Sequence, residues 1–284
     1  FILFYIFKNG IAVINWQLLT ELPKPVGETG GGISNAIIGT VLLVIISSIC
    51  SIPLGIGAGI YLSEHKQGRL SYAVRLCVEI LQGIPSIVIG IIAYVWIVMP
   101  LRTFSAVSGG LALGIMMLPI IVRSTEETLK LIPDSLKEAS LALGVPYYKT
   151  ILKVIVPAGL SGMVTAIIIS IARVAGETAP LLFTAFGNPF MSTDISQPIA
   201  TLPQTVFVYA ISPYPDWQAK AWASALVLIG VIGEGVVDLT TWVKSPLWHR
   251  RIARFSVVIL IAGLAAEILT QVQSNNRTGL IIAA

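Results

Sequence analysis

The sequence predicts an all-α protein that crosses a membrane about six times. Charged residues make up only 11% of the chain, whereas about a quarter of the positions are charged in a typical soluble domain. Three stretches, 33–62, 80–101 and 103–122, contain no charged residue. Each can cross a hydrocarbon core of about 30 Å, which needs about 20 helical residues. Backbone groups in lipid must be satisfied within the segment, so we expect these stretches to be helices.

The predicted spans follow one another without a long polar linker, which indicates a single transmembrane domain over residues 1–254. Residues 1–7 are interpreted as the end of a first span whose start is missing. The other expected spans are 33–62, 70–99, 109–132, 158–185 and 221–243. The status of residues 255–284 stays open, because their apolar stretch is short and is interrupted by Glu267.

Glycine and proline predict where these helices are irregular. Pro53 and the Gly55/Gly59 spacing favour a kink and close helix packing in the second span. A Gly-Ile-Pro-Ser sequence at 83–86 interrupts the third span, and Gly176 and Pro180 interrupt the fifth. Broken helices at membrane depth are tolerated where they line a cavity.

The basic residues predict the orientation of the chain. The positive-inside rule places the loops with most Lys and Arg in the cytoplasm, and these loops hold Lys66, Arg69, Lys130, Lys137, Lys149, Lys153, Lys244, Arg250, Arg251 and Arg254. Only Lys24, Arg102 and Lys220 lie in the opposite set of loops. Segment 133–157 is therefore expected in the cytoplasm and loop 187–220 outside. The basic residues are spread among loops, which does not indicate nucleic-acid binding.

Two charged residues lie inside the fifth predicted span, where a charge is a functional hypothesis by default. Arg173 and Glu177 are four residues apart and share one helix face, and Thr178 adds a hydroxyl group. Arginine presents a planar fork of donors that suits a phosphate-like anion. A carboxylate can accept a hydrogen bond from an anion that keeps a proton, as phosphate does and sulfate does not. The alternative is that Arg173 and Glu177 only pair with each other.

Other polar residues in the spans receive weaker assignments. Arg123 lies near the cytoplasmic end of its span, where it either steers an anion inward or anchors the helix end at the membrane interface. Glu79 is expected to pair with Arg75 on one helix face. Cys50 and Cys77 are interpreted as packing thiols. The sequence predicts no metal site, no cofactor and no catalytic residue.

The cytoplasmic segment 133–157 reads PDSLKEASLALGVPYYKTILKVIVP. Asp134 near its start complements a helix dipole. Gly144 and Pro146 predict a turn into a second short helix. A short amphipathic helix tied to spans on both sides can be pushed by another protein and can move the membrane helices.

This segment resembles the EAA loop of permeases in ATP-binding-cassette (ABC) importers, and the resemblance rests on Glu138, Ala139, Ser140, Gly144 and Pro157. Ser140 stands where a second alanine is usual. The resemblance implies a type I ABC importer permease fold whose short cytoplasmic coupling helix docks into an ATPase subunit through these residues. The sequence contains no Gly-x-x-x-x-Gly-Lys-Ser/Thr motif, so ATP hydrolysis is expected in a partner chain and this chain is not expected to be an enzyme.

Residues 172–180, ARVAGETAP, resemble the permeases of phosphate importers of the PstA type, as do residues 79–88, 118–127 and 221–228. The resemblance implies inorganic phosphate as cargo and the plasma (inner) membrane of a bacterium or archaeon as location. It implies three kinds of partner, namely a sister permease in a heterodimer, two ABC ATPase subunits and an external phosphate-binding protein. Two alternatives stay open: a permease for molybdate, sulfate or phosphonate, and a membrane phosphate sensor or scaffold that transports nothing.

Overall fold

The computed structural model describes residues 1–28 and 30–244, and every regular element in that part of the chain is a helix. The α-helices are α1 (Ile2–Ile11), α2 (Trp16–Thr20), α3 (Ser34–Glu64), α4 (Arg69–Gly83), α5 (Ser86–Ala93), α6 (Met99–Leu101), α7 (Ala106–Lys130), α8 (Asp134–Ala142), α9 (Tyr147–Thr150), α10 (Val156–Ala175), α11 (Ala179–Thr184), α12 (Leu202–Ala210) and α13 (Pro215–Lys244). Two π-helical segments are η1 (Tyr94–Val98) and η2 (Ile151–Ile155).

Three helical segments among the described residues are long and apolar enough to cross a membrane. They are α3 with 31 residues, α7 with 25, and the continuous helix Tyr147–Ala175 with 29, which contains α9, η2 and α10. The segments Arg69–Gly83 and Ser86–Leu101 add a fourth if they are counted as one span. The first and last expected spans correspond to α1, which has only 10 residues, and to α13, which has 30.

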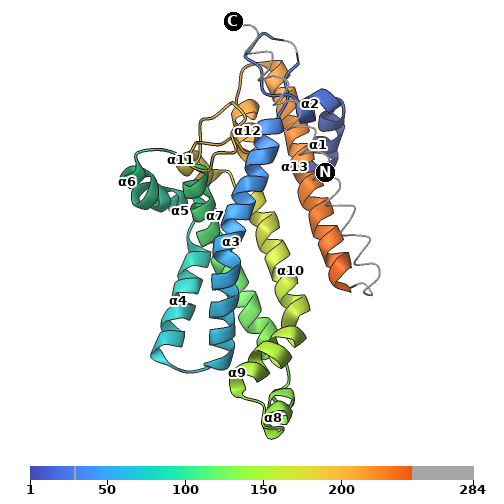
Figure 1. The fold of residues 1–284 in the computed structure, drawn as a ribbon. Helices are drawn as coiled ribbons and strands as arrows, with labels where there is room; N and C mark the ends of the chain where they lie inside the picture. The colour runs from blue at the N-terminus through green and yellow to red at the C-terminus, as the bar shows by residue number, and fades with distance from the viewer. Residues whose placement is uncertain (29, 245–284) are drawn as a thin grey trace, which may run out of the picture.

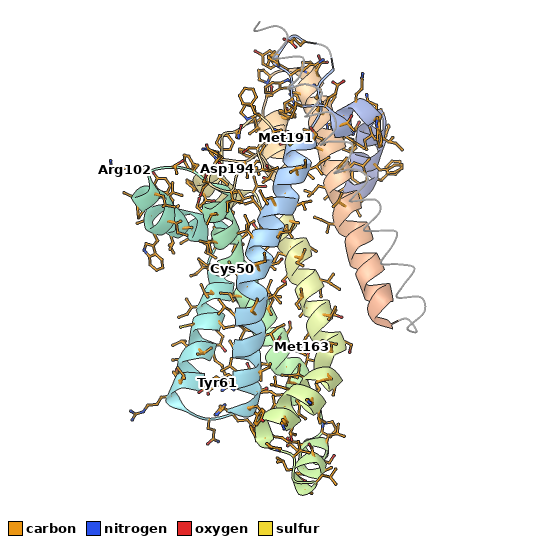
Figure 2. The ribbon with its side chains drawn as sticks, viewed as in Figure 1. Cys50, Tyr61, Arg102, Met163, Met191 and Asp194 are labelled. Carbon is orange, nitrogen blue, oxygen red and sulfur yellow. The ribbon has the colours of Figure 1, made fainter. Side chains whose placement is uncertain are left out.

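The long helices run side by side in an elongated bundle (Figure 1), which Figure 2 shows in the same view with its side chains. Helices α8 and α9 lie at one end of the bundle, while α2 and α12 lie toward the other, and α5 and α6 project sideways. The turn between α3 and α4, which holds Lys66, lies at the same end as α8, in agreement with a shared side for these basic loops.

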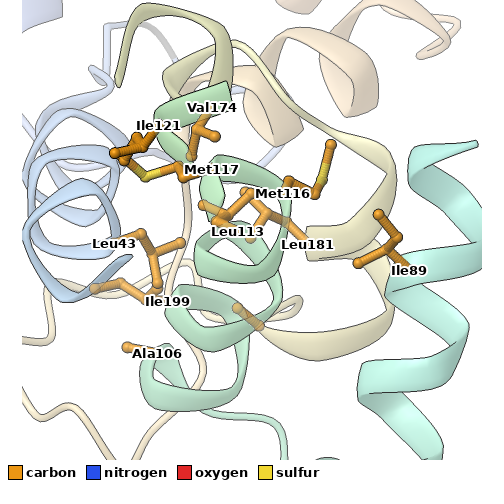
Figure 3. Packing of buried hydrophobic residues seen from close by; sticks show 11 residues of the cluster. Leu43, Ile89, Ala106, Leu113, Met116, Met117, Ile121, Val174, Leu181 and Ile199 are labelled. Carbon is orange, nitrogen blue, oxygen red and sulfur yellow. The ribbon is translucent and has the colours of Figure 1, made fainter. Parts of the chain in front are cut away.

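The centre of the bundle is the contact between α3 and α7, which is the most extensive helix contact in the described chain. Gly55 and Gly59 bring the two backbones together: an added Cβ would lie 2.7 Å from Ile121 Cγ2 at Gly55 and 2.5 Å from Thr125 Cβ at Gly59. The predicted close packing at this glycine spacing is therefore confirmed. Side chains from α3, α7, α10 and α11 complete the core, as Figure 3 shows for Leu43, Leu113, Met117, Ile121, Val174 and Leu181.

The expected span 70–99 is not one straight helix, although its interruption was placed correctly. The chain bends by 109° between α4 and α5. Ile84 is extended, with φ −76° and ψ 129°, because the ring of the following Pro85 disfavours the helical region for the residue before it. α5 therefore leaves the direction of α4.

Two segments contain longer or additional helix than the sequence predicted. The helix that was expected to begin at residue 158 is continuous from Tyr147, because a π-helical turn, η2, precedes Pro157. In η2 the Val156 N–H bonds to the Ile151 carbonyl, and the register changes just before a proline that has no N–H to donate. Loop 187–220 contains α12 and the first turns of α13. The open question about residues 255–284 lies outside the described residues.

Candidate functional site

The fifth predicted span is broken between α10 and α11, at the predicted position. The N–H groups of Gly176 and Glu177 bond to the carbonyls of Arg173 and Val174 at 3.2 and 3.1 Å, which closes α10 with a tight turn. Pro180 lies in the first turn of α11, where a missing N–H costs nothing because no carbonyl of that helix would receive it. Backbone groups of the break itself thus close the end of α10.

Arg173 and Glu177 face each other beside this break. Arg173 Nε lies 3.7 Å from Glu177 Oε1, which is an ion pair too long to be a hydrogen bond. The Arg173 side chain is 57% exposed and that of Glu177 is 19% exposed. Thr178 is half-buried, and its hydroxyl does not cap α11. Within the described residues the guanidinium donates no hydrogen bond, so its donors are available to an anion.

The short helix α5, which follows the interruption at 83–86, packs against the segment after the break between α10 and α11. α5 packs on α11, and Gly90 of α5 is buried at the contact. A Cβ added at Gly90 would lie 2.6 Å from Pro180 Cα. Only glycine allows this approach, so the position of α11 depends on a residue of α5.

Arg123 lies apart from the Arg173–Glu177 pair. Its Nε lies 2.6 Å from Glu127 Oε1 on the same helix, and both side chains are exposed. Val174 shares a core cluster with Met117, and Arg123 follows Met117 by six residues on α7, about 9 Å along the axis. The structure therefore gives Arg123 an ion pair of its own, nearer the α8 end.

Segment 133–157 begins with a helical hairpin of α8 and α9, the two short helices that were predicted there. Gly144 has a φ of +78°, a left-handed conformation that costs glycine little and lets the chain turn after α8. Ser140 faces inward: its hydroxyl lies 2.9 Å from that of Thr150, and both residues are buried. The serine that replaces the usual alanine therefore ties α8 to α9.

The outer surface of this hairpin carries the other motif residues. Glu138, Ala139 and Gly144 are exposed, and so is Pro157 after η2. Within the described residues Glu138 makes no ion pair or side-chain hydrogen bond. The hairpin therefore has, among the described residues, an exposed carboxylate without an ion pair at Glu138.

Arg75 does not pair with Glu79, contrary to the sequence prediction. Its Nε donates to Glu126 Oε1 at 2.9 Å, and its other nitrogens donate to the carbonyls of Leu62 and Lys66 at 2.9 and 3.1 Å. Glu126 is 2% exposed and also accepts from Lys130. The reason is burial: a buried carboxylate requires charged partners, whereas Glu79 is exposed.

Sequence reasoning missed one further polar contact, at the end of α3. Glu64 accepts hydrogen bonds from Lys137 of α8 and from Tyr147 of α9. Burial by itself would lower the pKa of Lys137, but the hydrogen bonds to Glu64 and Tyr147 outweigh it and raise the pKa above its usual range. No local signal in the sequence pairs these residues, since Glu64 and Lys137 are 73 positions apart.

Several curated proteins are similar to the chain over most of its length. The phosphate transport system permease protein PstA of Yersinia pestis is 45% identical over 228 residues, which cover 80% of this chain and 77% of that protein. PstA of Xylella fastidiosa is 43% identical and covers 78% of this chain, with 77% of its own length matched. PstA 1 of Mycobacterium tuberculosis is 38% identical, over 72% of this chain and 67% of that protein.

A solved structure and a family model agree on the fold. A chain of the inward-facing structure of the MetNI methionine ABC transporter has a similar fold, with a TM-score of 0.57 and 21% sequence identity. The match covers 78% of this chain and 94% of the transporter chain. This likeness confirms the predicted type I ABC importer permease fold. Residues 51–239 match the model described as binding-protein-dependent transport system inner membrane component. The chain therefore belongs to the family of inner membrane components of binding-protein-dependent transport systems.

Proposed function

We propose that this chain is the permease subunit of an ATP-driven phosphate importer and forms half of the translocation pathway. The observation that carries the proposal is the 45% identity to a phosphate transport permease over 80% of the chain. It is joined by an exposed arginine beside a broken helix, which is a group suited to an oxyanion.

Arg173 and Glu177 divide the recognition of phosphate between them. Arg173 donates to the anion through its planar fork. Glu177 accepts a hydrogen bond from the proton that phosphate keeps near neutral pH, and it repels an anion without such a proton. Thr178 adds a hydroxyl donor, and Arg123 attracts the anion further along, toward the α8 end. Because Arg173 and Glu177 are 3.7 Å apart, phosphate oxygens can replace their mutual contact.

The hairpin α8–α9 couples this pathway to a separate ATPase. The free carboxylate of Glu138 and the exposed Ala139, Gly144 and Pro157 supply the docking surface, while Ser140 keeps α8 fixed on α9. ATP binding in two partner ATPases pushes the hairpin from the cytoplasm and opens the pathway outward, and hydrolysis resets it. A sister permease completes the pathway, and an external phosphate-binding protein delivers the anion at the face that holds loop 187–220.

Uptake of labelled phosphate tests this function in the complete complex reconstituted in vesicles. Wild type is compared with Glu177→Gln, with sulfate as competitor and the exposed Glu79→Gln as the matched control. We expect Glu177→Gln to lose phosphate uptake or to become sensitive to sulfate, with its subunits still assembled. A variant with unchanged rate and selectivity would make the Arg173–Glu177 pair structural.

The same vesicles separate the two alternative functions. If sulfate, molybdate or phosphonate stimulated ATP hydrolysis and uptake while phosphate did not, the cargo would be a different oxyanion. If the assembled complex hydrolysed ATP but accumulated no anion, a phosphate sensor or scaffold would be the better description.

A further inference from the structure

Three polar side chains meet where the bundle contacts the coupling hairpin. Lys137 of α8 and Tyr147 of α9 both donate to Glu64 Oε2 near the end of α3. The Lys137 Nζ also lies 4.9 Å from the centre of the Tyr147 ring. Glu64 and Lys137 are only 11% and 22% exposed as side chains, so water screens their attraction less than it screens an exposed pair.

This contact gives the hairpin a third attachment to the membrane helices. The chain itself joins α8 to α7 through the turn at 131–133, and joins α9 to α10 through η2. α3 lies elsewhere in the sequence and has no such connection. Among the described side chains of α3, Glu64 is the one that accepts hydrogen bonds from both helices of the hairpin.

The end of α3 is in turn fastened to the rest of the bundle. Arg75 of α4 donates to the carbonyls of Leu62 and Lys66, and its Nε binds Glu126 of α7. Five residues before Glu64, Gly59 lies so close to Thr125 that an added Cβ would be 2.5 Å from the Thr125 Cβ. A displacement at Glu64 therefore reaches α4 and α7 through contacts that leave little room for independent movement.

We propose that Glu64 is a positioning residue that transmits the displacement of the hairpin α8–α9 to α3, and from there to α4 and α7. The proposal rests on the proposed function as a permease driven by an ATPase. A neighbouring pair does not fill this role: Lys66 and Asp134 are 4.0 Å apart, with side chains 69% and 77% exposed, and such pairs contribute little.

The ratio of phosphate taken up to ATP hydrolysed measures this transmission in the reconstituted complex. We expect Glu64→Ala to lower the ratio about fivefold or more, in the range of ordinary coupling between sites, while hydrolysis continues. Lys66→Gln is the matched control and is expected to keep the wild-type ratio. Co-purification of the ATPase subunits shows that each variant has assembled. An unchanged ratio in an assembled Glu64→Ala complex would overturn the proposal.

A charge exchange separates transmission from a general loss of stability. Glu64→Lys and Lys137→Glu are each expected to uncouple the complex, because each places like charges together. The double variant restores opposite charges and is expected to recover at least half of the ratio. A double variant no better than either single variant would refute a role for the pair.

A distance measurement tests the relay independently of the cargo. Spin labels at Ile49→Cys on α3 and Lys149→Cys on α9, with Cys50 and Cys77 replaced by serine, report whether the hairpin and α3 move together. We expect the distance to stay constant on ATP binding in wild type and to become ATP-dependent in Glu64→Ala. Identical distance distributions in wild type and in Glu64→Ala would refute transmission through Glu64. A wild-type complex that takes up no phosphate would instead refute the proposed cargo and leave this measurement valid.

Discussion

Replacing Gly90 by alanine is expected to displace α11 and impair transport. The added methyl group would lie 2.6 Å from Pro180 Cα, whereas non-bonded carbon atoms rest about 3.5–4.0 Å apart. The neighbouring atom belongs to the backbone of α11, so no side-chain rotation can relieve the contact. The two short helices must move apart by about 1 Å to restore a normal separation.

This movement is expected to displace residues of the proposed pathway. Overpacking a buried contact typically costs about 1–3 kcal/mol, which a bundle of this size can absorb without unfolding. Pro180 is two residues from Thr178 and three from Glu177, so the same shift moves both groups. By analogy with enzymes, in which a 1 Å misplacement can cost about 100-fold, we expect phosphate uptake to fall by roughly 10- to 100-fold.

Uptake of labelled phosphate and co-purification of the ATPase subunits check this prediction together. Gly57→Ala is the matched control, because a Cβ at Gly57 meets nothing within 4 Å. Gly57→Ala is expected to behave as wild type, while Gly90→Ala assembles but transports poorly. If the two alanine variants transported equally well, the contact between α5 and α11 would not position the pathway.

Three other substitutions probe separate parts of the molecule. Arg173→Lys is expected to lower phosphate uptake at least about tenfold, because lysine lacks the planar fork; wild-type uptake kinetics would remove Arg173 from the pathway. Glu138→Ala should weaken ATPase docking and lower uptake in assembled vesicles, and unchanged uptake would contradict the docking role. Glu126→Ala removes the carboxylate that Arg75 and Lys130 share. We expect about 1.5–3 kcal/mol of destabilisation from the lost charged hydrogen bonds, seen as a lower thermal midpoint of the purified complex; an unchanged midpoint would contradict that role.

The interruptions of the helices could be predicted from sequence because their causes are local. Pro85 acts on the residue before it, and Pro180 lacks the N–H that a continuing helix would use. The angle of 109° between α4 and α5 was not predictable, since it depends on what α5 packs against. A short helix after Pro146 was predicted, but its continuity with the following span was missed for a similar reason: η2 accommodates Pro157 by changing the hydrogen-bond register, and the sequence carries no clear signal for such a turn.

The partners in the ion pairs were harder still to predict from the sequence. The i,i+4 partner of Arg75 is Glu79, yet Arg75 binds Glu126, which is 51 positions away. Helical spacing identifies side chains on one face, but it does not say which of them is buried. Burial decides the outcome, because a carboxylate that is 2% exposed needs both Arg75 and Lys130.

The two interrupted segments support each other, and their contact accounts for the position of the charged pair. α5 follows one break, α11 follows the other, and the two short helices pack together. Val174 before the second break and Leu181 after it are both buried in the central core, which fixes the backbone on each side. Arg173 then stays 57% exposed beside a rigid turn. A charge that is held in place but is not enclosed by its own chain can bind an anion by giving up one loose ion pair, and the proposed pathway through Arg173 rests on this arrangement.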